Sequence, residues 1–413
     1  MAWAITWAAG MHGLMAHATE PSSLPRHLPE IWQRVDEANA AVRSAQREWQ
    51  GTQADAVSAR LGPPTQFSVL SQAIDPRHLQ GDAWHKPIDT IARIDHVIER
   101  GDKPALRAQV AEANQAAARQ SWHGTVLSQR VAASQAYWDL KLAQEQLATR
   151  ERHAQLAAET SRLAQIRLDK GDLSRLEATR LAVEAQRSQN DLGIARLAWR
   201  QAQQQLAALL RLTPQASQLS ADDDWPTPPS TDGMAQDSWV AARPEVAAAR
   251  SRWTASQQAL SLADAQRSTD VTVSVQFEHN PVVADRLWGV GIAVPLGMDG
   301  RQDGPRQRAL LAAQEAEAQW QDAVAQAQAT WQAQGDALRE ASDRLQRLRI
   351  QLLPQAREAL KAAEFARQQG ALGLQDVLDA RRALYAAELD EGTAQADLAK
   401  AAAALNTPAP IAE

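Results

Sequence analysis

The chain has 413 residues, 45% of them hydrophobic, and a formal net charge of −6, so it lacks the basic balance typical of nucleic-acid binding. It contains no cysteine, which excludes disulfides, thiolate metal sites, cysteine nucleophiles and a lipoprotein cysteine. Mean hydropathy is −0.43 and alanine makes up much of the apolar fraction, a composition that favours long, closely packed helices over a thick globular core.

The N-terminal residues have the pattern of an export signal. Residues 1–15 are apolar and uncharged, and Ala16-His17-Ala18 is an A-x-A cleavage pattern. Residues 1–18 are therefore predicted to be a secretory signal peptide. The n-region lacks Lys and Arg, and the alternative is a disordered or helical N-terminal segment. No later stretch has the roughly 20 consecutive apolar residues of a membrane-spanning helix.

Residues 19–212 are predicted to form a first structural repeat. Proline is favoured at a first helical turn, and Gly62-Pro63-Pro64 stops a helix. Alternation of apolar and polar residues indicates strands. The expected elements are a helix over 29–60, strands over 65–73 and 88–98, a long helix over 103–170 and a return helix over 172–212.

A second repeat, residues 240–405, is predicted to have the same order. A linker rich in Pro, Asp, Ser and Thr, residues 213–239, precedes it, and residues 406–413 form a tail. Pro354 is expected to kink the long helix. The expected elements are a helix from Pro244, strands over 269–278 and 287–296, a long helix over 305–369 and a return helix to 405.

The strongest signal is the duplication of a glycine tip. Gly171 and Gly370, about 199 residues apart, each follow a long Ala/Gln/Arg-rich run and open another. Glycine tolerates the left-handed backbone that ends one helix and reverses into the next, so each is predicted to be the tip of a helical hairpin. Coiled-coil spacing of seven supports paired helices in both repeats: Leu140 and Leu147, Leu156 and Leu163, and Leu338, Leu345 and Leu352.

The strands are predicted to carry one apolar face and one face of polar or small residues. Four strands cannot close a barrel, since small barrels need about eight. Three chains would supply about twelve strands and leave no unpaired edge in lipid. The alternative is an open sheet packed on the helices. Trp84 and Trp288 flank the strands, either as membrane-interface anchors or through ordinary packing.

Three stretches carry a resemblance to a known family. They are residues 370–380 (Gly-Ala-Leu-Gly-Leu-Gln-Asp-Val-Leu-Asp-Ala) with Leu384-Tyr385, residues 290–296 with the loop 300–304, and residues 243–250. With the duplicated order of elements, the chain resembles the TolC family of trimeric outer-membrane efflux proteins, in its cobalt–zinc–cadmium resistance branch. Two features depart from that family: Gly297-Met298-Asp299-Gly300 replaces the usual apolar-Phe-Asn-Arg turn, and the first helix looks abbreviated.

The resemblance implies a mainly α fold with a small β part. Long α-helical hairpins would form an α-barrel, and four antiparallel strands would join a trimeric 12-stranded transmembrane β-barrel. It further implies a homotrimer in the outer membrane of a Gram-negative bacterium, in contact with lipid. Its partners would be a periplasmic adaptor and an RND-type inner-membrane pump. The expected function is a passive exit duct for heavy-metal cations; the alternatives are a duct for drugs or type I protein secretion, and a soluble coiled-coil scaffold.

The resemblance also assigns candidate site residues at the tips. Asp376 and Asp379 match the ring at the periplasmic aperture, where a trimer would present six carboxylates that favour cations. Their alternative role is as solvated carboxylates in a first helical turn. Arg367, Asp172 and Glu177 are candidates for a polar latch between hairpins. The residues expected to dock the adaptor, or simply to turn the chain, are Gly171, Leu173, Ser174, Gly370, Leu372 and Gly373.

No catalytic or metal-binding pattern is recognisable. The nine histidines include no i, i+4 pair, the methionines number five, and His279 next to Glu278 is expected to be an ordinary loop histidine. A P-loop, a dinucleotide fingerprint and a Ser-His-Asp pattern are all missing from the sequence. We therefore expect no enzyme activity, no cofactor and no bound metal, so that energy for transport comes from a partner pump.

Overall fold

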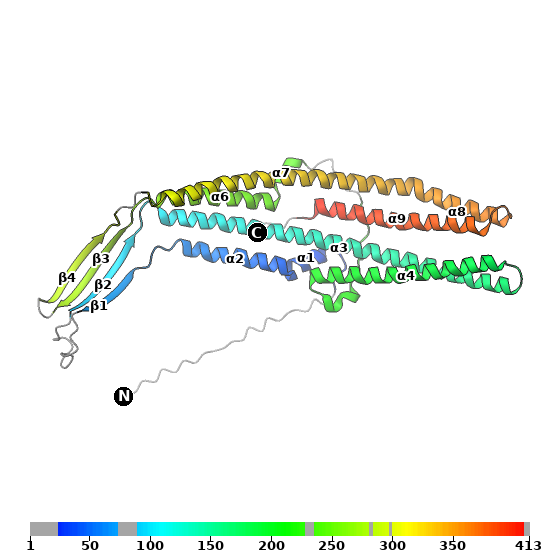
Figure 1. Cartoon of the computed structure of the whole chain (residues 1–413), viewed down its shortest axis with the longest axis horizontal. Helices are drawn as coiled ribbons and strands as arrows, with labels where there is room; N and C mark the ends of the chain where they lie inside the picture. The colour runs from blue at the N-terminus through cyan, green and yellow to red at the C-terminus, as the bar shows by residue number, and fades with distance from the viewer. Residues whose placement is uncertain (1–23, 73–88, 228–234, 281–283, 297–299, 409–413) are drawn as a thin grey trace, which may run out of the picture.

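The computed structural model of the chain describes residues 24–72, 89–227, 235–280, 284–296 and 300–408. The predicted signal peptide and Trp84 lie outside the described residues. The molecule is elongated, with four strands at one end and two helical tips at the other (Figure 1). The chain reverses at both ends, so sequence-distant helices run side by side along its length (Figure 1).

The first repeat has two short helices where one was expected. Asn39 has an extended backbone, with φ −62° and ψ 134°, and its side chain accepts hydrogen bonds from the N–H groups of Ala41 and Val42. Asn39 therefore ends one helix and caps the next, so the prediction of one unbroken helix over 29–60 was wrong. The elements are α1 (Leu28–Ala38), α2 (Ala40–Ala59), β1 (Gln66–Gln72), β2 (Asp89–Ile98), α3 (Lys103–Asp169) and α4 (Arg175–Leu210).

The second repeat follows the expected order, with a shifted last strand. The final strand ends at Ala293, three residues before the predicted end at Leu296. The alternating pattern continues past Ala293, but Pro295 has no N–H to donate to a neighbouring strand. The linker contains η3 (Thr213–Gln218), and α5 (Gln236–Ala241) lies at its junction with the repeat. The elements of the second repeat are α6 (Pro244–Ala265), β3 (Val271–Asn280), β4 (Ala284–Ala293), α7 (Asp303–Arg347), η4 (Leu348–Leu352), α8 (Leu353–Gln368) and α9 (Leu374–Asn406).

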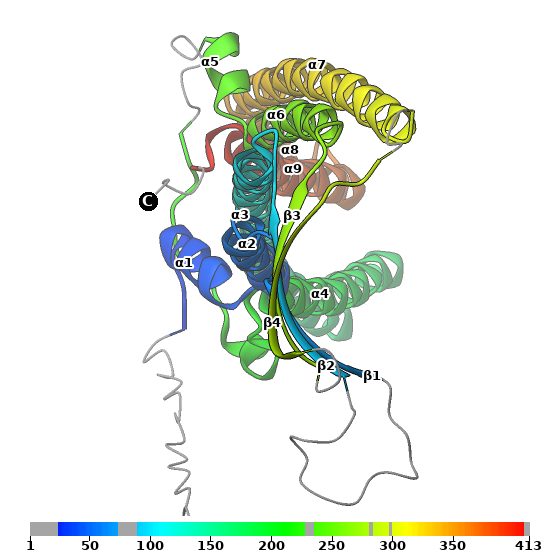
Figure 2. The ribbon, with the colours of Figure 1, turned by 90° about the vertical axis from the view of Figure 1, so that its left-hand side faces the viewer.

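The four strands form one antiparallel sheet in the order β1-β2-β3-β4. Its central pair, β2 with β3, joins the two repeats. Figure 2 shows the sheet curving away from the end of the helices, with no helix laid across its outer part. The alternative considered from the sequence, an open sheet packed on the helices, is therefore not observed. Because β1 and β4 each pair on one side only, the single chain leaves two strand edges open.

One face of the sheet is apolar and bare. The strand register aligns four apolar side chains in one row, and the next row, two residues along, adds Phe277 and Trp288. Trp288 packs edge-on against Phe277, with ring centroids 5.2 Å apart. The four residues of the first row and their exposed fractions are Phe67 (68%), Ile94 (49%), Val275 (45%) and Val290 (89%).

The opposite face is mainly polar and includes two glycines on β4. Gly291 lies opposite Ser274, and a Cβ atom on it would lie 2.5 Å from the serine Oγ. Gly289 lies opposite Gln276, whose Cγ would be 2.9 Å from such a Cβ. Glycine on β4 thus leaves the space that the β3 side chains occupy. The small residues of the predicted alternation are a steric requirement of this face.

Short helices lie end to end beside each long one. In Figure 1, α6 and α9 follow one another along α7 and α8, and α2, α1 and α4 follow one another along α3. Helix α3 has 67 residues, a length of about 100 Å. None of the helices within the described residues is both long enough and apolar enough to cross a membrane.

The second long helix is interrupted beside Pro354 by a π-helical turn, η4. The N–H of Leu353 donates to the carbonyl of Leu348, five residues back. The extra residue shifts the helical phase. Leu338 and Leu345, which precede this turn, are buried, whereas Leu352, its last residue, is 43% exposed, so the heptad does not continue through the turn.

The largest core cluster lies midway along the molecule. Tyr137 is fully buried there, and its hydroxyl oxygen lies 2.8 Å from both the carbonyl oxygen of Arg26 and a carboxylate oxygen of Asp223. Around it pack Ile31, Leu140, Leu206 and Leu210 from three helices. This cluster ties the first residues of the described chain and the linker to α3 and α4.

Candidate functional site: the hairpin tips and their seam

Both tips end their first helix in the same way. Gly171 has φ +81° and Gly370 has φ +73°, and the N–H of each donates to the carbonyl three residues before it. The next N–H, from Asp172 or Ala371, donates five residues back, which completes a Schellman motif. The glycines are needed because a side chain is strained at these φ values. The duplication therefore extends to individual hydrogen bonds.

The predicted tip carboxylates Glu177 and Asp376 occupy equivalent positions in the first turn of α4 and α9. The Ser174 hydroxyl accepts from the N–H of Glu177 at 3.2 Å and donates to its carboxylate at 2.9 Å. At the second tip, Gly373 has no side chain, and its N–H donates to the Asp376 carboxylate at 3.0 Å. Both carboxylates therefore help to start a helix, whatever further role they have.

The remaining tip residues lie together at one end of the molecule. Asp379 is exposed and is held by the amide of Gln375 at 3.1 Å and the guanidinium of Arg382 at 3.2 Å. Leu372 is 41% exposed. The other predicted docking residues, Gly171, Leu173, Ser174, Gly370 and Gly373, lie at the turns and are exposed or half-buried.

The three candidate latch residues do not connect the hairpins in the single chain. Among the described residues, no hydrogen bond or ion pair joins Arg367, Asp172 or Glu177 to the other hairpin. One guanidinium nitrogen of Arg367 is buried without a hydrogen-bond partner. Their role as a latch therefore stays a prediction.

The hairpins instead meet along a seam, defined here as the contact of α9 with α3 and α4. Its apolar part, nearest the tips, buries Leu374 and Leu378 of α9 against Ala164 of α3 and Leu181 of α4. Its far end is polar, where the ammonium of Lys400 lies 2.9 Å from the carboxylate of Asp139. The seam is thus a narrow contact between two hairpins.

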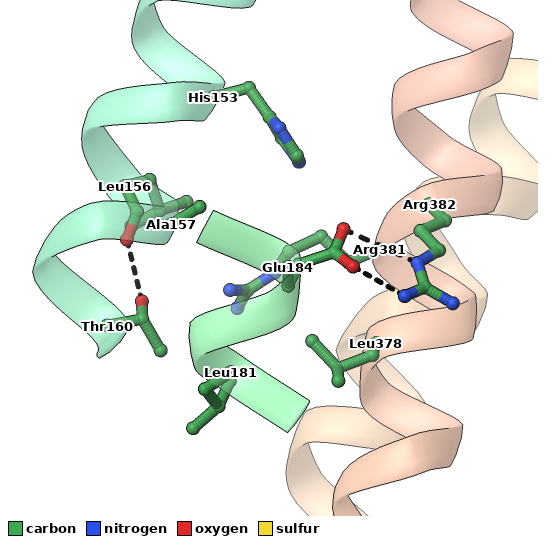
Figure 3. Close-up of a pocket in the computed structure, with 9 residues that line it drawn as sticks. All are labelled: His153, Leu156, Ala157, Thr160, Leu181, Glu184, Leu378, Arg381 and Arg382. Carbon is green, nitrogen blue, oxygen red and sulfur yellow. Dashed lines mark hydrogen bonds and ion pairs between the residues drawn. The ribbon is translucent and has the colours of Figure 1, made fainter. Parts of the chain in front are cut away.

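An ion pair crosses the seam beside the apolar part. The guanidinium of Arg382 on α9 donates two hydrogen bonds to the carboxylate of Glu184 on α4 (Figure 3). One is from Nε at 3.4 Å, and the other, which is shorter, is from Nη2. The side chain of Glu184 is 13% exposed. The hydrogen bond between the two side chains lowers the pKa of Glu184 and raises the pKa of Arg382. The pair is therefore ionised across the physiological range.

His153 of α3 lies at the same place. Its ring stacks on Tyr385 of α9, with centroids 4.2 Å apart and planes 18° from parallel. Its Nδ1 lies 3.2 Å from the hydroxyl of Ser188 on α4. With Glu184 and Arg382, His153 lines a cavity of about 20 Å³ between the hairpins (Figure 3). One histidine thus contacts two helices on which the seam depends.

Sequence reasoning missed Glu184, Arg382 and His153 as site residues. The partners Glu184 and Arg382 are 198 residues apart, and nothing local marks either of them. The duplication offered the one usable signal. Since the two tips are equivalent, residues at similar distances from Gly171 and Gly370 face each other when the hairpins lie side by side.

The sequence and the fold were compared with known proteins. No protein-family model matches the sequence. It is 23% identical to the cobalt-zinc-cadmium resistance protein CzcC of Cupriavidus metallidurans, over 85% of this chain and 82% of CzcC. The structure matches the outer membrane protein VceC of Vibrio cholerae with a TM-score of 0.74, at 21% identity, over 92% of this chain and 94% of VceC.

The chain has the TolC-type fold. The MtrE outer membrane channel of Neisseria gonorrhoeae matches with a TM-score of 0.71 and 17% identity, over 92% of this chain and 88% of MtrE. The predicted fold class, long helical hairpins with four antiparallel strands, is confirmed. In a TolC-type chain the strands and the tips lie at opposite ends, so the seam lies far from the sheet (Figure 1).

The described residues do not form an evident metal centre. Within the parts of the chain that the structure describes, no three His, Asp or Glu side chains converge as metal ligands would. The candidate site consists of the carboxylates at the tips and the contact between the two hairpins.

Proposed function

We propose that this chain is the outer-membrane duct of a tripartite exporter in a Gram-negative bacterium, and that it passes heavy-metal cations. The observation that carries the proposal is the bare apolar face of the sheet, in a chain with the TolC-type fold. Val290 at 89% exposed and Trp288 at 76% are stable in lipid but costly in water. The relative CzcC, a cobalt-zinc-cadmium resistance protein, supports the cargo.

The functional unit is a homotrimer. The open edges of β1 and β4 need partners in lipid, and three copies supply about twelve strands, enough for a closed barrel. Exposed apolar side chains on one helix give the helical part a matching surface for a neighbouring copy. They are Leu176, Val183, Ile194 and Leu197 of α4.

The duct is passive, and its partners supply the energy and the connection. An adaptor protein docks at the tips, and an RND-type pump drives the cations. The exposed turns around Gly171 and Gly370 suit packing against the ends of other helices. Arg367, Asp172 and Glu177 supply polar contacts there, either to the adaptor or between subunits.

Deletion of the gene tests the cargo. Growth on zinc, cobalt and cadmium should fall, and the wild-type gene should restore it. A strain that instead becomes sensitive to drugs, or loses a secreted protein, would move the cargo to the alternative ducts. Fractionation tests the class of protein: a heat-modifiable trimer in the outer membrane supports a duct, whereas a cytosolic monomer would support the coiled-coil scaffold.

The tip carboxylates are expected to set cation preference. In the variant Asp376→Asn with Asp379→Asn, six charges are removed from a trimer while an amide oxygen remains to cap α9. The cation-to-anion permeability ratio in planar bilayers should fall. Asp336→Asn, an exposed carboxylate on α7 away from the tips, is the matched control and should leave the ratio unchanged. Equal ratios in both variants would remove the aperture role.

A further inference from the structure

His153, on α3, is half-buried between α9 and α4. Its ring stacks on Tyr385 of α9, and its Nδ1 lies 3.2 Å from the Ser188 hydroxyl of α4. Figure 3 shows the ring projecting from α3 into the space between the hairpins, near Glu184 and Arg382. Its position makes the contact of α9 with α3 sensitive to the state of one imidazole.

Charges of both signs face His153, and its burial is what most opposes a positively charged ring. From α9 come Arg381 and Arg382, and from α3 comes Arg150, whose guanidinium lies 6.0 Å from the Tyr385 ring. The nearby anions, both on α4, already have partners. Glu184 is bound to Arg382, and Asp191 pairs with Arg150 at 3.7 Å.

Protonation of His153 therefore weakens the seam by either of two routes. An imidazolium that finds no counterion is a half-buried charge among arginines, and the packed seam disfavours it. An imidazolium that attracts Glu184 takes that carboxylate from Arg382 and loosens the ion pair between the hairpins. Both routes favour a state in which α9 has moved away and His153 is in water.

We propose that His153 is a proton-sensitive element of the seam, whose protonation releases α9 from α3 and α4 and so separates the two hairpins. The movement is a property of the single subunit. It rests on the proposed function only for its consequence, which is a duct that opens more readily in an acidic compartment.

The electrostatics agree with this direction. Burial lowers the pKa of His153 below its ordinary value of 6.5. Of the nearby charges, the Glu184 carboxylate raises this pKa and the Arg381 guanidinium lowers it, each by less than burial does. The neutral ring therefore stabilises the packed seam fully above pH 6.5, and this stabilisation is lost as the pH falls below 6.5 toward the lowered pKa. Glu184 stays ionised over this range because its own pKa is lowered by Arg382.

A single cysteine can report the separation, since the chain has none of its own. Ala164 is 4% exposed and lies against Leu374 and Leu378, so the thiol of Ala164→Cys becomes reachable only when α9 moves away. The purified full-length protein in detergent is labelled with a maleimide at pH 7.5, 6.5 and 5.5. Rates are divided by those of Ala371→Cys, an exposed tip position that corrects for thiol ionisation.

The corrected rate should rise several-fold from pH 7.5 to 5.5 with His153 present. It should stay flat with His153→Phe, which keeps a ring against Tyr385 but cannot be protonated, and with His153→Gln, a second variant should the first not fold. A rate that is flat with His153, or rises equally in the variants, overturns the proposal. Because labelling needs no transport, failure here leaves the duct function standing, and failure of the growth assay leaves this result standing.

Discussion

A Val290→Arg variant is expected to lose the outer-membrane trimer. Val290 is 89% exposed and lies on the apolar face, in the row with Phe67, Ile94 and Val275. An arginine facing lipid at the bilayer midplane costs about 2–4 kcal/mol, and a trimer incurs that cost three times. A total of roughly 6–12 kcal/mol is comparable to the whole stability of an ordinary domain.

The matched control is Ala293→Arg on the same strand. Ala293 pairs with Thr272, so it shares the opposite face with Ser274 and Gln276, and it is exposed. In the proposed trimer the same charge would face the water-filled lumen, so this variant should be tolerated. The measurement is the amount of heat-modifiable trimer in the outer-membrane fraction. Equal trimer yields from the two variants would show that the apolar face does not contact lipid.

The different outcomes expected for Val290→Arg and Ala293→Arg follow from the alternation of apolar and polar residues in the sequence. Period-two alternation is local, so it predicts both the existence of the strands and their apolar face. The end of β4 was misplaced because Val294 and Leu296 continue the alternation, while the missing N–H of Pro295 and the register with β3 decide where pairing stops. Pattern sets the face of a strand, and pairing sets its length.

The helices divide in a similar way. Gly171 and Gly370 were predictable because a left-handed turn is a local backbone requirement. The break at Asn39 was not, because an unbroken helix is compatible with the residues on either side. What holds the break is tertiary: the Asn39 amide donates to Gln129 at 3.0 Å and to the Leu209 carbonyl at 3.1 Å. Neither partner is visible from residues near Asn39.

The candidate site was predicted where it is local and missed where it is not. Asp376 was named as a candidate by resemblance, and the structure shows that it also caps α9, where it lies three residues after Gly373. Glu184, Arg382 and His153 needed knowledge of how one hairpin lies on the other. The equivalence of the tips indicates roughly how the two hairpins align, but it does not show which side chains meet between them.

Removing the ion pair that crosses the seam should open the duct. With Arg382→Ala, Glu184 keeps a charge that is only 13% exposed and has lost its partner. Breaking a fully buried pair costs about 3–5 kcal/mol and an exposed one about 0–1 kcal/mol. Because the Arg382 side chain is 40% exposed, we expect an intermediate cost of about 1–2 kcal/mol, or roughly a 5- to 30-fold shift toward separated hairpins in each subunit.

A double-mutant cycle separates this pair from a general loss of packing. Glu184→Gln on the Arg382→Ala background removes the stranded charge, so the double variant should open less readily than Arg382→Ala alone. Arg162→Ala is the control, because its pair with Glu159 lies within α3 and both side chains are more than half exposed. The open probability in planar bilayers is the measurement. Additive effects of Glu184→Gln and Arg382→Ala would mean that the two residues act independently, and the seam would then be held by its apolar cluster, which a charge cannot regulate.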